Sequence, residues 1–240
     1  MNWIGRLVRL PLKLVPVSTP LRILSGPLAG QRWISTAGPH GCWLGTYERE
    51  LQNLFVRTVR AGDVVWDIGA NVGFFTLLAA RRVSPAGRVL AIEPLPRNLE
   101  LLKQHLALNG IGNVTVLAQA VADARGTAFL APGTSPSMGH LDAEHGIEVA
   151  VTTIDALVES GVAPAPRIVK MDIEGAESRA LAGARQTLER HRPTILLSTH
   201  GWAQHEACVS ILGELGYELS LRRDGAADGQ YELVALPRRH

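Results

Sequence analysis

The sequence predicts an α/β fold in which helices cover both faces of a mainly parallel sheet. Short apolar segments alternate with longer segments of helical periodicity from residue 48 onward, a pattern typical of parallel sheets. A glycine-containing turn follows the first of these apolar segments, as it does in many open α/β sheets. With 240 residues, 46% of them hydrophobic and 19% charged, the chain suits a single globular domain.

Each element follows from a local pattern. Apolar runs bounded by turn residues predict strands at 64–68, 88–93, 114–119, 167–172 and 194–198. Segments of helical periodicity predict helices at 48–60, 73–82, 96–109, 154–160, 176–190 and 204–215. In the helix at 96–109, Pro96 suits the first turn and the following Gly110 suits the end.

The remaining segments are shorter. Two closing strands, 217–221 and 231–235, flank a polar loop, and short strands at 127–130 and 147–152 flank a Gly/Pro/Ser loop at 131–146. Loops of this composition lie on the surface and often carry function. We therefore expect the 131–146 loop over the mouth of a pocket, where it lines an acceptor site together with the N-terminal residues.

Residues 1–45 form a basic arm, which precedes a domain that we expect to span residues 46–240. The first acid in the chain is Glu48. Residues 1–17 mix apolar side chains with cations and resemble a weak membrane-surface anchor, although they are too short and charged to span a bilayer. The alternative is an arm folded onto its own domain or onto a dimer mate. No signal-peptide cleavage pattern follows.

Composition excludes some partners and locations. The net charge is +2, the basic residues are scattered, and aromatic residues make up only 5% of the chain, so no nucleic-acid partner is expected. The two cysteines, Cys42 and Cys208, are far apart and lack metal-ligand spacing. We expect reduced, buried thiols and a cytoplasmic protein.

The most informative segment is the turn from Asp67 to Gly73, which reads Asp-Ile-Gly-Ala-Asn-Val-Gly. Its glycines allow a close backbone approach, and the following helix start offers free N–H groups, so it suits a nucleoside-bearing ligand. A dinucleotide fingerprint requires Gly-x-Gly-x-x-Gly, but Asn71 and Phe74 stand at two of these three positions. The segment therefore favours S-adenosylmethionine, whose ammonium group Asp67 would attract, with Gly69, Ala70, Asn71 and Gly73 in the binding turn.

Glu93 ends the next predicted strand, 20 residues after Gly73. An acid at this strand end accepts hydrogen bonds from both ribose hydroxyls in NAD sites and in S-adenosylmethionine sites. The alternative is that Glu93 is only a surface carboxylate before a turn. Adenine is then expected beside Ala120 and Val121, with Asp123 near its amino group.

A second group of polar residues follows the strand at 167–172. Lys170 within a buried strand requires a carboxylate partner, either Asp172 or Asp67. Asp172 lies at the carboxyl end of this strand, where α/β sheets build active sites. Glu174 and Glu177 come at the start of the next helix, where the alternative role is to complement its dipole.

His200 follows the strand at 194–198 and is expected to face the same pocket. An ordinary imidazole pKa of ~6.5 suits proton removal at neutral pH. The chain contains 8 histidines, so an incidental role for His200 is the alternative.

Three ordered motifs carry a family resemblance. The segments 66–74, 91–94 and 169–177, preceded by Gly45-Thr46-Tyr47-Glu48, resemble the FkbM family of S-adenosylmethionine-dependent methyltransferases. The resemblance implies a Rossmann-like class I methyltransferase fold, with a seven-stranded sheet whose last strand is antiparallel. It also implies methyl transfer to a hydroxyl of a sugar, glycolipid or other secondary metabolite, so the expected partner is a small-molecule or glycan acceptor.

Such a transfer needs a general base for the acceptor hydroxyl. We expect Asp172 or His200 in this role, with Glu174 orienting the acceptor. The acids at 172, 174 and 177 would alternatively suit Mg²⁺, but no further ligand is evident and no metal is expected. The rival functions are a non-catalytic cofactor-binding regulator or scaffold and, more remotely, an NAD-binding oxidoreductase.

Overall fold

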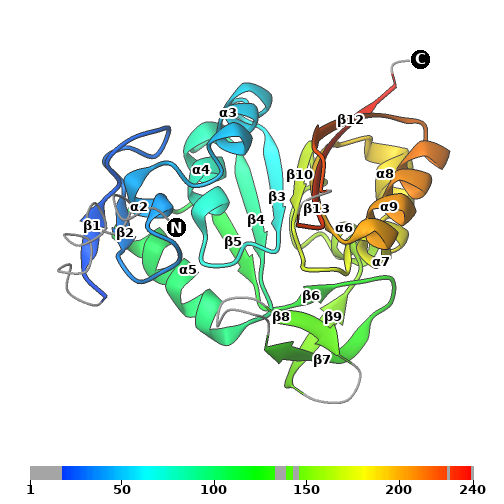
Figure 1. Ribbon diagram of the computed structural model, residues 1–240, viewed down its shortest axis with the longest axis horizontal. Coiled ribbons are helices and arrows are strands. Elements are labelled where there is room, and N and C mark those ends of the chain that lie inside the picture. The colour runs from blue at the N-terminus through cyan, green and yellow to red at the C-terminus, as the bar shows by residue number, and fades with distance from the viewer. Residues whose placement is uncertain (1–17, 133–138, 143–145, 226–227, 239–240) are drawn as a thin grey trace.

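The computed structural model describes residues 18–132, 139–142, 146–225 and 228–238 (Figure 1). Its centre is a seven-stranded sheet in the order β12-β13-β11-β10-β3-β4-β5. These strands are β3 (Val64–Ile68), β4 (Arg88–Ile92), β5 (Val114–Leu117), β10 (Ile168–Met171), β11 (Thr194–His200), β12 (Tyr217–Arg223) and β13 (Gln230–Pro237). β13 is antiparallel to both of its neighbours, β12 and β11, and the pairs that join β11, β10, β3, β4 and β5 are all parallel. The predicted mainly parallel sheet with an antiparallel last strand is confirmed.

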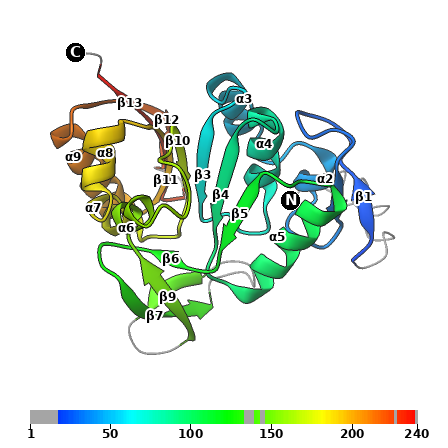
Figure 2. The ribbon, with the colours of Figure 1, turned by 180° about the vertical axis from the view of Figure 1, so that it is seen from behind.

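Helices cover both faces of this sheet, as Figures 1 and 2 show from opposite sides. One face carries α3 (Arg49–Thr58), α4 (Phe74–Val83) and α5 (Pro96–Leu108), and the other carries α6 (Ile154–Glu159), α7 (Glu177–Ala182), α8 (Arg185–His191) and α9 (Trp202–Glu214). Side chains alternate between the faces along each strand. Val65 of β3 therefore packs in the first core, whereas Trp66 and Ile68 pack in the second.

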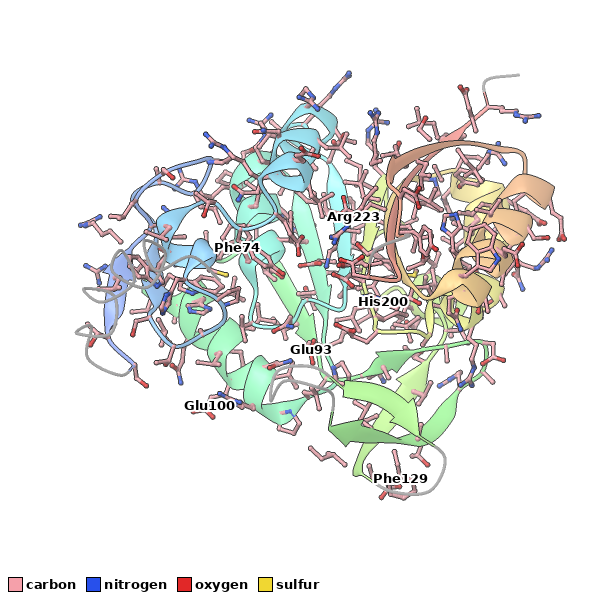
Figure 3. All side chains as sticks on the ribbon, in the orientation of Figure 1. Phe74, Glu93, Glu100, Phe129, His200 and Arg223 are labelled. Atoms are coloured by element: carbon pink, nitrogen blue, oxygen red, sulfur yellow. The ribbon has the colours of Figure 1, made fainter. Side chains whose placement is uncertain are left out.

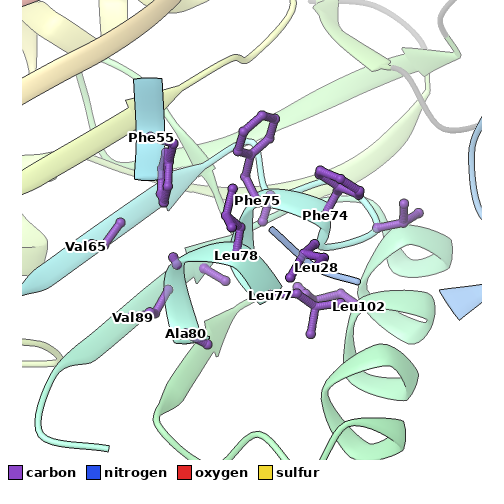
Figure 4. Packing of buried hydrophobic residues seen from close by; sticks show 14 of the residues in the cluster. Leu28, Phe55, Val65, Phe74, Phe75, Leu77, Leu78, Ala80, Val89 and Leu102 are labelled. Carbon is purple, nitrogen blue, oxygen red and sulfur yellow. The ribbon is translucent and has the colours of Figure 1, made fainter. Parts of the chain in front are cut away.

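The first core is centred on α4, a helix with few exposed positions. Its buried side chains gather with Val65 and Val89 of the sheet, Phe55 of α3 and Leu102 of α5 (Figure 4). A helix that is apolar on nearly all sides is stable only when it is enclosed. The turn that leads into α4 is thus held between the sheet and two other helices.

The single helix predicted at 176–190 is two helices. The chain bends at Gly183, whose carbonyl accepts a hydrogen bond from the N–H of Asp155 at 3.0 Å. The carboxylate of Asp155 then accepts hydrogen bonds from the N–H groups of Gln186 and Thr187, at 3.1 and 2.8 Å. These bonds satisfy the first donors of α8, as a capping residue does. The cap is distant in sequence, so local periodicity did not reveal the break.

Residues 18–45, the described part of the N-terminal arm, contain three short elements that were not predicted: β1 (Pro20–Arg22), β2 (Arg32–Ile34) and α2 (Gly41–Leu44). β1 and β2 pair only with each other. Trp33 is fully buried and stacks on His105 with the ring centroids 3.9 Å apart. Residues 18–45 are therefore folded onto the domain, whereas the membrane-surface contact expected of residues 1–17 lies outside the described residues.

A second, four-stranded sheet has the order β6-β9-β7-β8. It consists of β6 (Ala120–Val121), β7 (Gly126–Pro132), β8 (Gly139–Asp142) and β9 (Ile147–Thr152). The loop expected at 131–146 thus contains the strand β8, and its residues 133–138 and 143–145 lie outside the described part.

Cys42 and Cys208 are free and buried, as expected. Within the described residues, no helix has the length and apolarity needed to cross a membrane.

His105 of α5 connects the N-terminal segment to the turn after β3. Its Nδ1 lies 2.7 Å from the carbonyl oxygen of Val72, and the N–H of Ile34 donates to its Nε2 at 3.0 Å. The ring is therefore neutral, with its proton on Nδ1. Burial lowers the pKa of His105 to about 4.

This pKa predicts a loss of stability in acid. An unfolded histidine titrates near pH ~6.5, so the stability that His105 contributes is complete above that pH and is lost as the pH falls toward 4. Between these values the unfolded chain binds a proton that folded His105 does not. The free energy of unfolding should fall by ~3 kcal/mol more in the wild type than in His105→Gln. Urea unfolding at pH 7 and pH 4 measures this difference, and equal pH dependences of the two proteins would contradict it.

Candidate active site

A cavity of about 510 Å³ opens at the carboxyl ends of the central strands. Glu93, which follows β4, and His200, which ends β11, both line it, and Figure 3 shows both at this edge of the sheet. The residues predicted from sequence that line the cavity are Gly69, Ala70, Asn71, Glu93, Ala120, Val121, Asp172, Glu174 and His200. Asp67 and Gly73 are not among its described lining residues.

Asp67 lies beneath the cavity and is fully buried. One of its oxygens accepts a hydrogen bond from the hydroxyl of Thr76 at 2.6 Å, and the other lies 3.8 Å from Nζ of Lys170. Burial raises the pKa of Asp67, while Lys170 and Thr76 act in the opposite direction. The geometry therefore does not support the expected contact between Asp67 and a ligand ammonium group, because the carboxylate of Asp67 faces Lys170 of the protein instead.

Lys170 has both of the carboxylate partners that its burial predicted. The pairing of β10 with β3 places Lys170 directly opposite Asp67, and Nζ also lies 3.6 Å from Oδ2 of Asp172. Burial alone would lower the pKa of Lys170, but Asp172, Asp67 and Glu48 raise it above its ordinary value. Lys170 is thus a fixed cation that holds the end of β10 against the turn after β3.

The glycines of the turn are required by packing within the protein. Gly69 has a φ of +78°, and a Cβ there would lie 1.9 Å from the backbone oxygen of Asp172. Gly73 has a φ of +95°, and a Cβ there would lie 2.4 Å from Cδ1 of Leu102. Both glycines were expected to make room for a ligand. In the structure they make room for neighbouring chain segments, and the backbone between them lines the cavity.

Gly69→Ala is therefore expected to destabilise the fold by at least ~2 kcal/mol, because it combines a left-handed backbone with a clash against another strand's backbone. Gly62→Ala is the matched control: Gly62 has a φ of +84° with no atom near the position of a Cβ, so only the conformational cost of ~1 kcal/mol applies. Chemical denaturation of both variants separates the two contributions. Equal losses of stability would show that the close approach to Asp172 is unimportant.

Glu93 is 4% exposed and organises the opposite wall of the cavity. Its Oε2 accepts a hydrogen bond from the N–H of Asn71 at 2.8 Å, and its Oε1 accepts from the N–H of Leu95 at 2.9 Å and from Nδ2 of Asn98 at 3.2 Å. Burial raises the pKa of Glu93, and these three hydrogen bonds oppose that shift. A carboxylate offers about four acceptor positions, so Glu93 retains capacity for a ligand hydroxyl.

The side expected to receive adenine is formed by β6. Ala120 and Val121 are buried and line the cavity beside Gln119. Asp123 is placed elsewhere: it is exposed and forms an ion pair with Arg179, with an O···N distance of 2.8 Å. Asp123 is not among the described residues that line the cavity, so its expected contact with adenine stays a prediction that this arrangement does not support.

The opposite end of the cavity holds a cluster of acids around one imidazole. Nε2 of His200 lies 3.6 Å from Oδ1 of Asp172 and 3.6 Å from Oε2 of Glu174. Its Nδ1 lies 2.9 Å from Oε1 of Glu177, a side chain that is fully buried. Glu177 also accepts hydrogen bonds from the N–H groups of Ile173 and Gly175, so it organises this loop and is more than a dipole partner of α7.

These acids change the expected chemistry of His200. Burial alone would lower the pKa of His200, but the hydrogen bond to Glu177 and the charges of Asp172, Glu177 and Glu174 raise it to about 9. Beside these three carboxylates, His200 is cationic at neutral pH. It is therefore not the neutral base that its ordinary pKa suggested. Burial likewise raises the pKa of Glu174.

Several lining residues were missed as site residues from the sequence, and Tyr47 and Glu48 are the polar pair among them that a motif could have indicated. Tyr47 and Glu48 precede α3 and line the cavity, and Glu48 adopts a left-handed backbone with a φ of 42°. They belong to the Gly45–Glu48 motif, which was the available signal. Gly38, Pro39 and Cys42 also line the cavity, as expected of the N-terminal residues.

Comparison with known proteins identifies the relatives of this chain. The sequence profile described as "Methyltransferase FkbM domain" matches residues 67–219. The chain is 27% identical to the hexuronic acid methyltransferase AglP of Haloferax volcanii over 169 residues, which cover 70% of this chain and 68% of that protein.

Solved structures show the same fold. A methyltransferase FkbM from Methylobacillus flagellatus KT has a TM-score of 0.52 at 20% identity, covering 82% of this chain and 53% of that one. A precorrin-6y C5,15-methyltransferase from Geobacter metallireducens GS-15 also has a TM-score of 0.52, at 16% identity, covering 78% and 89%. These similarities establish the class I methyltransferase fold. Because the family profile covers more than half of its length, the chain belongs to the FkbM family of methyltransferases.

Proposed function

We propose that this chain is an S-adenosylmethionine-dependent O-methyltransferase that acts on a hydroxyl of a sugar, with a sugar acid as the first candidate. The observation that carries the proposal is the continuity of one cavity, which joins Glu93 at one end to Asp172, Glu174 and His200 at the other. Glu93 would hold the ribose, and Ala120 and Val121 would contact the adenine. The sugar class is supported by the similarity to a hexuronic acid methyltransferase.

In the proposed reaction, an acceptor oxygen attacks the methyl carbon of the sulfonium. A carbon–oxygen bond forms, the sulfur–methyl bond breaks, and sulfur keeps the electron pair, which leaves S-adenosylhomocysteine. The hydroxyl proton passes to Asp172, since the raised pKa of His200 favours its cationic form. Alignment of the reacting atoms can contribute ~7–11 kcal/mol, and a general base ~10²–10⁴-fold in rate.

The proposal is tested with S-adenosylmethionine carrying a labelled methyl group. The purified chain is incubated with hexuronic acids, neutral hexoses, glycolipids and small phenols, and products are analysed by mass spectrometry and NMR. A methyl ether on a sugar acid is expected. Transfer to nitrogen or carbon, or only to a non-sugar acceptor, would contradict the proposal, and inactivity with every acceptor class would favour a cofactor-binding regulator or scaffold.

A further inference from the structure

Three side chains that can bind a metal ion lie together at the end of the cavity that holds His200. Asp172, Glu174 and His200 each offer one ligand atom, and these three atoms lie within 4.8 Å of one another. Each carboxylate oxygen is 3.6 Å from Nε2, which is longer than the 2.7–2.9 Å typical of a charge-assisted hydrogen bond. The three side chains are partly buried, so they face the cavity and not bulk water alone.

Glu177 determines which nitrogen of His200 faces the two acids. It is fully buried, and its Oε1 accepts a hydrogen bond from Nδ1 of His200 at 2.9 Å. When His200 is neutral, the proton on Nδ1 leaves a lone pair on Nε2, which lies 3.6 Å from two carboxylate oxygens that are also acceptors. Three such acceptors require a positive charge among them, and either a second proton on the ring or a bound cation supplies it. A buried carboxylate behind the distant nitrogen is the usual partner of a metal-binding histidine.

The spacing suits an ion better than a proton. A proton on Nε2 would leave both carboxylates beyond good hydrogen-bond length. One cation can lie ~2.1 Å from both atoms of each pair, because the atoms are 3.6 Å apart and twice that bond length exceeds this separation. Oε2 of Glu177 is also buried without a hydrogen-bond partner among the described residues, while Oε1 of the same carboxylate contacts the imidazole.

We propose that Asp172, Glu174 and His200 bind one divalent cation, with Glu177 orienting the imidazole. The mixed nitrogen and oxygen ligands favour a first-row ion such as Mn²⁺ over Mg²⁺. These ligands differ from the three acids at 172, 174 and 177 that the sequence suggested, because Glu177 faces His200 and not the ion. Three protein ligands leave positions open toward the cavity, as at catalytic metal sites. Binding of acceptor oxygens at these open positions rests on the proposed function. Binding of the ion itself does not.

The binding is tested with Mn²⁺ and the full chain, stripped of metal with a chelator. Titration followed by electron paramagnetic resonance should show one bound Mn²⁺ per chain, and Mg²⁺ at equal concentration should not displace it. Pulsed measurements should show modulation from a directly bound imidazole nitrogen. His200→Gln should lose this modulation and bind Mn²⁺ at least ~10-fold more weakly, and Asp172→Asn should bind more weakly by a similar factor. Asp123→Asn, which alters an exposed ion pair outside the cavity, should bind Mn²⁺ normally.

Glu177→Gln tests the positioning role separately. It should weaken Mn²⁺ binding by ~10-fold while the nitrogen modulation remains, because the imidazole is still a ligand. Melting temperatures and binding of S-adenosylhomocysteine, measured for every variant, show that each one is folded.

Three results would overturn the inference: no Mn²⁺ binding, bound Mn²⁺ without nitrogen modulation, or unchanged affinity in both His200→Gln and Asp172→Asn. Failure of the proposed function has a different signature, since the wild type would then bind Mn²⁺ but not S-adenosylhomocysteine. Binding of S-adenosylhomocysteine without Mn²⁺ would remove the metal site and leave the proposed function standing.

Discussion

Replacing Glu93 by glutamine is expected to weaken the binding of S-adenosylhomocysteine by at least ~10-fold. In the proposed complex, the carboxylate of Glu93 accepts a hydrogen bond from a ribose hydroxyl at the acceptor position that its three internal hydrogen bonds leave open. A hydrogen bond to a charged group contributes ~1.5–3 kcal/mol, which corresponds to a ~10-fold effect or more. Glutamine keeps the size of the side chain but loses its charge and one acceptor oxygen. Isothermal titration calorimetry measures the change directly.

The control for this experiment is Asp123→Asn. Asp123 follows the adenine side of the predicted site in sequence, yet it lies outside the cavity in an ion pair with Arg179. Its replacement should leave the affinity unchanged. Because Glu93 also accepts hydrogen bonds from Asn71, Leu95 and Asn98, the melting temperature of Glu93→Gln must be compared with that of the wild type. A folded Glu93→Gln with wild-type affinity would remove Glu93 from the ribose site.

Asp172→Asn is expected to lower the rate of methyl transfer by ~10²–10⁴-fold while it retains the binding of S-adenosylhomocysteine. The carboxylate of Asp172 lies between Lys170 and His200, at the end of the cavity that is opposite Glu93. Asparagine has nearly the same shape but cannot accept the hydroxyl proton or bind a cation as strongly. Turnover with labelled cofactor and calorimetry with the product cofactor separate the two effects.

Glu214→Gln provides the comparison for Asp172→Asn. Glu214 forms an exposed ion pair with Arg185 on the helical surface, and such pairs contribute little. Its variant should retain full turnover. If Asp172→Asn also retained full turnover, Asp172 would have no part in the chemistry. If it lost the cofactor as well, its role would be structural, through Lys170.

The central sheet was predictable because its inner parallel strands, such as β4 and β10, are buried on both faces and read as apolar runs. The N-terminal strands were not, because β1 and β2 are each 3 residues long and their position depends on Trp33 meeting His105 of α5. The break between α7 and α8 was hidden for a similar reason, since it depends on Asp155, a residue about 30 positions earlier in the chain.

Glu93, Asp172 and His200, which the sequence places at or just after predicted strand ends, all line one cavity. Their roles in that cavity stay predictions. The inward turn of Asp67 toward Lys170 depends on the register between β3 and β10, which the sequence alone does not reveal. Likewise, the raised pKa of His200 comes from Glu177, whose approach requires the bend of the chain before α7.

The central claim is that the cavity between Glu93 and Asp172 receives S-adenosylmethionine and not a dinucleotide. Calorimetric titration of the wild-type chain with S-adenosylhomocysteine and, separately, with NADH tests it without knowledge of the acceptor. We predict saturable binding of one S-adenosylhomocysteine per chain and no binding of NADH. Saturable binding of NADH without binding of S-adenosylhomocysteine would contradict the account.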